Sequence, residues 1–158
     1  MYADTVARLA DSGIFQYEIS NFARPGFESR HNLKYWRRHD YLGLGLSAHS
    51  CLGARRFFNT ESMDDYLEGH ILEGSQVISD HDILAETIML GLRLCEGVDL
   101  DSLRAEHGEQ VLAYDNAFAP YISRGLMRKI GSRLAFTSEG MYVSNAILSE
   151  VLEFEELD

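Results

Sequence analysis

The sequence has few cysteines and prolines, and it lacks several familiar catalytic motifs. Its two cysteines, Cys51 and Cys95, match no redox or zinc spacing, which favours two incidental thiols over a metal centre. Two prolines in 158 residues argue against disorder, and 46% hydrophobic residues are enough for a packed core. A Walker loop, a GxGxxG motif and a readable Ser/His/Asp arrangement are all absent, and we predict no catalytic residue in this chain.

Long apolar runs are lacking as well. No segment approaches the roughly 20 apolar residues that a membrane-spanning helix needs, and no signal peptide opens the chain. These absences lead us to expect a cytoplasmic protein without a membrane span.

Positive charge is scarce in the second part of the chain. Residues 1–58 carry eight Lys/Arg and five Asp/Glu, whereas residues 59–158 carry six and twenty, which gives the net charge of −11. The acidic part should repel nucleic acid, and the basic part could attract an anionic ligand. The change in composition near Asn59 predicts a domain boundary between residues 1–58 and 59–158.

The first twenty residues have the pattern of one α/β unit. Apolar residues at helical spacing predict a helix that ends at Gly13, and residues 14–20 then alternate as a strand does. Helix, glycine and strand in this order are typical of an α/β layer or barrel. In a barrel, the polar face of this strand, which includes Glu18 and Ser20, would point into the lumen, where barrels keep their chemistry.

A second strand is predicted over residues 40–47. Leucines share one face, and Gly43 and Gly45 share the other. Glycines at alternate positions leave a bare backbone surface, which either a ligand or another protein element could approach closely. His49 follows at the strand end, a position that suits a binding residue and a structural hydrogen bond alike.

From residue 60 onward the pattern becomes helical. Helix N-caps are predicted at Ser62, Ser79 and Thr137. Pro120 should divide the helix over residues 109–124 into two pieces. The turn signal Gly131-Ser132 predicts a hairpin over residues 126–137, and helices, a hairpin and a last helix together resemble a winged-helix arrangement.

A cluster of ligand-capable side chains lies between the two predicted strands. His31 can ligate a metal, or an iron held in a macrocycle, and Tyr35 and Trp36 can stack on a planar ligand. Guanidinium groups pair well with carboxylates, including porphyrin propionates, and are supplied by Arg24, Arg30 and Arg37. A lone histidine is more often structural, but with these neighbours the sequence leaves both a structural role and a ligand role open for His31 and the adjacent Asn32.

Three segments carry a resemblance to a known family, namely YEISNFARPG, HNLKYW and YLGLGLSAHS. They resemble the radical S-adenosylmethionine (SAM) proteins related to oxygen-independent coproporphyrinogen III oxidase, and most of all their heme chaperone branch, the HemW-like proteins. The pattern HNxxYW, which marks that branch and is implicated in heme binding, is met here by His31, Asn32, Tyr35 and Trp36. Segments between residues 89 and 140 resemble the C-terminal domain of the same family.

The resemblance implies that the chain binds heme and that it lacks the N-terminal region of full-length members. Full-length members hold a [4Fe–4S] cluster and SAM in an N-terminal barrel region of about 200 residues, whereas the CxxxCxxC motif that ligates the cluster is absent here. We therefore expect the C-terminal part of such a protein, which binds heme with His31 on the iron and does not cleave SAM alone. Contacts to the cofactor are expected from Glu18, Ser20, Gly43, Gly45 and His49.

The expected fold class is α/β plus α+β. Residues 1–58 would form the C-terminal strands and helices of a partial radical-SAM (β/α) barrel, and residues 59–158 a helical winged-helix-like domain. Two other functions stay open: part of a coproporphyrinogen III oxidase, which HNxxYW disfavours, and a winged-helix nucleic-acid-binding module, which the acidic residues 59–158 oppose. An unpaired barrel edge would need covering, which predicts self-association, for instance as a homodimer.

Overall fold

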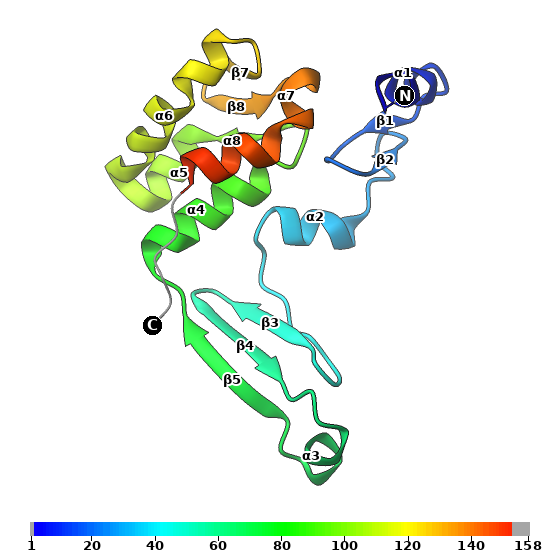
Figure 1. Cartoon of the computed structure of the whole chain (residues 1–158), viewed down its shortest axis with the longest axis vertical. Helices are drawn as coiled ribbons and strands as arrows, with labels where there is room; N and C mark the ends of the chain where they lie inside the picture. Colours follow the sequence, from blue (N-terminus) through cyan, green and yellow to red (C-terminus); the bar gives the residue numbers. More distant parts are fainter. Residues whose placement is uncertain (1, 153–158) are drawn as a thin grey trace. The chain divides into compact units, whose positions relative to one another are not determined.

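The structure, a computed structural model, describes residues 2–152, which fall into two compact units (Figure 1). One unit comprises residues 2–38 and 84–152, and the other comprises His39–Ile83. The strands of the described residues form three small antiparallel sheets and no closed barrel. No helix between residues 2 and 152 is long and apolar enough to cross a membrane.

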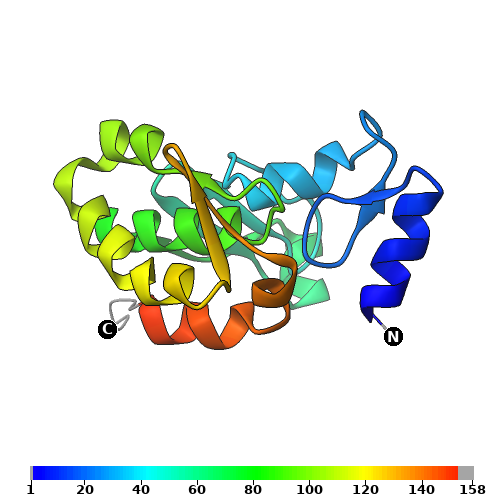
Figure 2. The same cartoon turned by 90° about the horizontal axis from the view of Figure 1, so that it is seen from above.

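The first unit opens with a helix and a two-stranded ribbon (Figure 2). α1 (Tyr2–Asp11) ends at Gly13, which takes a left-handed φ of 73° that glycine adopts without strain. β1 (Phe15–Gln16) then pairs antiparallel with β2 (Phe22–Ala23). The predicted helix and its glycine stop are therefore confirmed.

The strand predicted over residues 14–20 is shorter than predicted, because β1 comprises only Phe15–Gln16. Beyond β1, Glu18 forms only an isolated antiparallel bridge to Leu94, because the chain folds back to pair with β2 instead of running beside a parallel neighbour. Glu18, predicted to face a lumen, is completely buried, whereas Ser20, predicted for the same face, is exposed.

A turn at residues 24–27 leads into α2 (Arg30–Trp36), a helix of seven residues. The Ser29 side chain accepts the Asn32 backbone N–H at 3.3 Å and so caps the first turn. After the helix, Arg38 takes a left-handed φ of 51°, although it is not glycine.

The C-terminal part of this unit is a helical domain with a three-stranded sheet of order β6-β8-β7. The strands are β6 (Val98–Asp99), β7 (Met127–Ile130) and β8 (Arg133–Phe136). The helices are α4 (Asp80–Gly91), α5 (Leu100–His107), the 3-10 helix η1 (Gly108–Gln110), α6 (Val111–Ser123), α7 (Ser138–Tyr142) and α8 (Ser144–Val151). A single hydrophobic core joins them, and its most deeply buried side chains include Leu84, Ile88, Leu92, Phe118 and Leu134.

The hairpin and the helix cap predicted in this domain are confirmed. β7 and β8 pair around Gly131-Ser132, and the Thr137 hydroxyl accepts the Gly140 N–H at 3.1 Å to cap α7. The prediction that Pro120 splits its helix is wrong, since α6 continues through this residue. Pro120 is exposed near the end of α6, where water can satisfy the carbonyl that loses its backbone donor.

The second unit is a three-stranded antiparallel sheet of order β3-β4-β5 with one short helix. The strands are β3 (His49–Leu52), β4 (Arg55–Asn59) and β5 (Leu72–Val77), and α3 (Met63–Glu68) connects β4 to β5. Ser62 caps α3 as predicted, by accepting the Asp65 N–H at 3.2 Å.

Two predictions for this second unit are wrong. Residues 40–47 form no strand apart from a bridge between Tyr41 and Cys51, because positive φ angles at Gly45 and Ser47 turn the chain. The region after residue 60 is not all helical, because β5 adds a strand whose sequence, LEGSQV, has no regular apolar alternation. The predicted division at residues 58 and 59 falls inside this sheet, at the end of β4.

Candidate functional site

Two rings share an exposed face of α2. His31 and Tyr35 lie one helical turn apart, and both side chains are exposed. Their ring centroids are 5.0 Å apart at an interplanar angle of 82°, which is an edge-to-face contact. Arg24, in the turn before α2, and Arg30, its first residue, are exposed too. The imidazole is therefore accessible to a ligand and lies beside an aromatic ring.

The other two residues of the HNxxYW pattern face into the unit. Asn32 Nδ2 donates a long hydrogen bond of 3.5 Å to the Tyr17 hydroxyl. Trp36 is half-buried and lines a hollow of about 230 Å³, whose other walls come mainly from α4, β6 and α5. The four predicted heme-binding residues thus divide into an exposed pair and an inward pair.

Two arginines at the end of α2 form ion pairs with the C-terminal domain. Arg37 Nη2 donates to Glu96 Oε1 at 3.1 Å, but both side chains are about half exposed, so this pair contributes little stability. Arg38 Nε donates to Glu86 Oε2 at 3.0 Å, and there both side chains are only 12% exposed. Removing one partner of a pair so well buried leaves an uncompensated charge, which makes Arg38 the stronger anchor.

Glu18, a predicted cofactor contact, is completely buried. Its Oε2 accepts the Ser20 N–H at 3.2 Å, whereas its Oε1 has no hydrogen-bond partner among the described residues. A buried polar atom without a partner is costly, so the bridge to Leu94 and the packing around it must hold this side chain in place. The structure brings Glu18 and the exposed Ser20 together, but the carboxyl group itself is closed to solvent.

Three further predicted contacts, Gly43, Gly45 and His49, lie in the second unit. A Cβ at Gly43 would lie 2.3 Å from the His49 carbonyl oxygen, so the close approach at this glycine is to β3. The Gly45 carbonyl accepts the Asn59 side-chain amide at 2.7 Å, and the exposed His49 ring stacks on Phe58 with centroids 5.5 Å apart. Packing against β3 therefore explains why position 43 needs a glycine. Contact of Gly43, Gly45 or His49 with a ligand stays a prediction.

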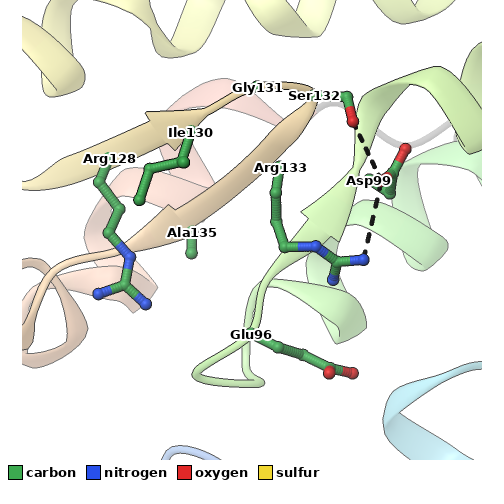
Figure 3. A pocket seen from close by; sticks show the side chains of 8 residues that line it. All are labelled: Glu96, Asp99, Arg128, Ile130, Gly131, Ser132, Arg133 and Ala135. Atoms are coloured by element: carbon green, nitrogen blue, oxygen red, sulfur yellow. Dashed lines mark hydrogen bonds and ion pairs between the residues drawn. The ribbon is translucent and has the colours of Figure 1, made fainter.

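A second hollow, of about 420 Å³, lies beside the sheet of the C-terminal domain (Figure 3). Its charged groups have partners within the chain. Arg128 donates to the Cys95 carbonyl oxygen at 3.1 Å, and Arg133 pairs with Asp99 at 3.7 Å. Asp99 also accepts the Ser102 backbone N–H to cap α5, and this hydrogen bond is the main reason why the pKa of its carboxyl group lies below the ordinary value.

The cysteines do not fit an iron–sulfur cluster. Such clusters are held by several cysteine thiolates, and the sequence has two cysteines, which lie in different units. Cys51 is buried. Burial raises the pKa of the Cys95 thiol, with Arg128 opposing the shift and Glu18 adding to it, and a raised pKa disfavours the thiolate that a metal requires. The residues of this chain therefore carry no step that depends on a cluster.

Sequence reasoning does not identify the partners of the inward-facing groups. Tyr17, Glu86 and Glu96 lie 15, 48 and 59 positions from the residues that they contact. Helix patterns link residues three or four apart, and strand patterns link residues two apart, so neither signal reaches these contacts. Opposite charge alone does not identify the partners of Arg37 and Arg38, because the sequence contains 25 Asp and Glu residues.

Residues 78–143 match the family model of the HemN C-terminal domain. A protein of Bacillus subtilis (strain 168) named heme chaperone HemW is 29% identical over 158 residues, covering 96% of this chain and 42% of that protein. The protein of the same name from Mycobacterium tuberculosis (strain ATCC 25618 / H37Rv) is 32% identical over 153 residues, covering 92% of this chain and 37% of the relative. The chain thus spans about two fifths of the length of these curated relatives.

A solved structure shares the fold. Coproporphyrinogen III oxidase (HemN) from Escherichia coli, described as a radical SAM enzyme, aligns with a TM-score of 0.70 at 18% identity, over 94% of this chain and 39% of that chain. At this level of identity the likeness concerns the fold alone. It confirms the mixed α and β architecture, and the curated relatives confirm the resemblance that the motifs indicated.

Proposed function

We propose that this chain is the C-terminal part of a HemW-like radical SAM protein, and that it binds heme and takes part in passing it on; the match to the HemN C-terminal domain and the curated relatives named heme chaperone HemW support this. The observation that carries this proposal is the exposed His31–Tyr35 pair on α2, inside the HNxxYW pattern. Heme is cargo in this function, so its protein ligands need to be reachable from solvent. An exposed histidine meets that need better than an enclosed one would.

His31 is the proposed ligand of the heme iron. A neutral imidazole offers one ring nitrogen to a metal while the other nitrogen keeps its proton. The Tyr35 ring, edge-on at 5.0 Å, limits the rotations open to the imidazole. Tyr35 also offers an apolar surface to a porphyrin plane that approaches along this face of α2.

Arg24 and Arg30 are the proposed contacts of the heme propionates. Both are exposed, and a guanidinium group can hold a carboxylate through two parallel hydrogen bonds. Arg37, predicted for the same role, would first have to leave Glu96, an exchange that costs little because their pair is half exposed. Contacts of Glu18, Ser20, Gly43, Gly45 and His49 with SAM or the porphyrin remain proposals of the same family resemblance.

We also propose that residues 1–58 belong to the end of a radical-SAM barrel, and that residues 59–158 are a winged-helix-like accessory domain. The likeness to HemN over 94% of the chain supports an origin of both parts in such a protein, but the sheet β3-β4-β5 spans the proposed boundary. The cluster and SAM would then come from an N-terminal radical SAM region, in a cytoplasmic protein.

β5 lies at a sheet edge, which supports self-association, and light scattering that gives a monodisperse monomer would contradict it.

Part of a coproporphyrinogen III oxidase is the second candidate, because HemN shares the fold. The curated relatives named heme chaperones are more similar in sequence, which favours the first candidate. Nucleic-acid binding is not proposed, because the cations of the β7–β8 hairpin contact groups of this chain. Those contacts are Arg128 with the Cys95 carbonyl, Lys129 with Asp115 and Arg133 with Asp99.

Hemin titration of the wild type and of His31→Ala tests the proposal. The wild type should give a Soret band typical of histidine ligation, and His31→Ala should raise the hemin Kd at least about tenfold. His70→Ala is the matched control, since that side chain is 75% exposed and lies in the second unit. Equal spectra for wild type and His31→Ala would remove His31 from the role, and equal binding of iron-free coproporphyrin by both would favour the oxidase alternative.

A further inference from the structure

We propose that Arg38 and Trp36 are positioning residues, which fix α2 on the C-terminal domain and thereby direct His31 toward heme. The inference rests on the proposed function and deepens it. It assigns to the HemN C-terminal domain the task of setting the orientation of the heme-binding helix.

α2 is too short to hold a direction by itself. It has seven residues, and isolated helices of this length are not stable in water. Residues four apart share a helix face, so α2 presents His31 and Tyr35 on one side and Asn32 and Trp36 on the neighbouring side. Contacts on the second side therefore decide where the first side points.

Trp36 provides the apolar part of this attachment. Its indole is half-buried and lines the same hollow as Leu94, Val98 and Leu103 of the C-terminal domain. A large aromatic ring in such a position favours the docked helix, because undocking would expose the ring and the apolar wall together. Stacking on a porphyrin, the role predicted for Trp36 from its motif, would require it to leave this place.

Arg38 provides the charged part, and its backbone indicates that the side chain matters. Arg38, which follows the C-cap residue Arg37, has a φ of 51°, a conformation that favours glycine just beyond a helix end. Arginine adopts it at a cost, which the surrounding structure must offset. The ion pair with Glu86 in α4, in which both side chains are 12% exposed, is the contact that does so. Arg37, by contrast, makes only a half-exposed pair.

Arg38→Gly separates the two possible roles of this residue. If Arg38 only terminates the helix, the Arg38→Gly variant should bind hemin as tightly as the wild type or more tightly, since glycine adopts the left-handed conformation without strain. If Arg38 positions α2, the same substitution deletes the anchor, so the hemin Kd should rise about tenfold and the Soret band should lose its single-histidine character. Arg38→Lys keeps a cation that can pair with Glu86 and should restore binding.

Trp36 reports on the attachment directly because it is the sole tryptophan of the sequence. In Arg38→Gly and Glu86→Gln, its fluorescence emission should shift to longer wavelength in the absence of hemin, while the circular dichroism and the cooperative melt of the domain are retained. Trp36→Phe should bind hemin better than Trp36→Ala. Arg104→Ala is the matched control, since it removes an exposed arginine that pairs with Glu109 on another surface, and it should change neither readout.

The outcomes distinguish this inference from the function on which it rests. If His31→Ala weakens hemin binding but Arg38→Gly and Glu86→Gln leave both the Kd and the Trp36 emission unchanged, only the positioning role is overturned. If His31→Ala binds hemin as the wild type does, the proposed function fails and the inference falls with it. Should Arg38→Gly fail to fold, Glu86→Gln, which keeps the shape of the side chain, supplies the same comparison.

Discussion

The Arg38–Glu86 pair should make a measurable contribution to stability, and a double-mutant cycle of Arg38→Gly and Glu86→Gln isolates it. Removing one partner of a fully buried pair costs about 3–5 kcal/mol, and the residual exposure of 12% on each side chain lowers the expectation to about 2 kcal/mol. Glycine at position 38 relieves about 1 kcal/mol of left-handed strain but adds about the same entropy to the unfolded chain. The backbone terms nearly cancel, so Arg38→Gly should report chiefly on the lost side chain.

Chemical denaturation, followed by Trp36 fluorescence and by far-ultraviolet circular dichroism, measures the three free energies of unfolding. Each single variant should lose about 2 kcal/mol, and the double variant should lose little more than either, which gives a coupling energy of about 1–2 kcal/mol. Agreement of the two probes would show that α2 unfolds with the C-terminal domain.

Two results would refute this reasoning. A coupling energy below about 0.5 kcal/mol would mean that the pair behaves as an exposed surface pair, despite its burial. An Arg38→Gly variant more stable than the wild type would mean that the strained backbone outweighs the ion pair. In either case Arg38 could not be the contact that holds α2.

Further predictions concern the C-terminal domain. Thr137→Ala removes the cap of α7 and should lower the free energy of unfolding by about 1 kcal/mol in urea titration. Gly97→Ala should lower the free energy of unfolding by about 3 kcal/mol or more, because the new Cβ would lie 2.0 Å from the Leu134 carbonyl oxygen and residue 97 has a φ of 69°. An unchanged denaturation midpoint would contradict this packing. The raised pKa of Cys95 means that iodoacetamide at pH 8 should alkylate it more slowly than free glutathione, and equal rates would argue against its burial. The lowered pKa of folded Asp99 adds stability that is present above its unfolded pKa and lost as the pH falls through the folded value, so Asp99→Asn should flatten the acid side of the stability profile.

Sequence signals predicted the elements whose determinants are local. Thr137 caps its helix through a residue three positions away, and Gly131-Ser132 forms a turn between adjacent strands. Both contacts are confined to a few neighbouring residues, so their chemistry can be read directly from the sequence. The residues of α2, by contrast, were identified by their ligand chemistry and by the HNxxYW pattern, and no helix was predicted over Arg30–Trp36.

The predictions that failed depend on distant partners. Glu18 alternates with apolar residues in a way that places it on a polar face, yet its bridge to Leu94 buries it. β5 has no strand pattern and exists because β4 offers it an edge. Periodicity describes which residues share a face, but the partner that covers that face is decided by the whole fold.

The different roles proposed for the residues of α2 also depend on partners that are distant in the sequence. The family match begins at residue 78, so Glu86 and Glu96 lie inside the HemN C-terminal domain, whereas His31 lies outside it. Burial of the half-buried Trp36 ring and the coupling energy of the Arg38–Glu86 pair are each about 1–2 kcal/mol, compared with about 1 kcal/mol for the Ser29 cap and less for the exposed Arg37 pair. The Trp36 and Arg38 contacts are both made with the C-terminal domain, and together they exceed the contribution of the cap. If His31 binds heme as proposed, the C-terminal domain, which has no predicted heme ligand, would set how well it binds, because a short helix that is free to turn would spend binding energy on its own ordering.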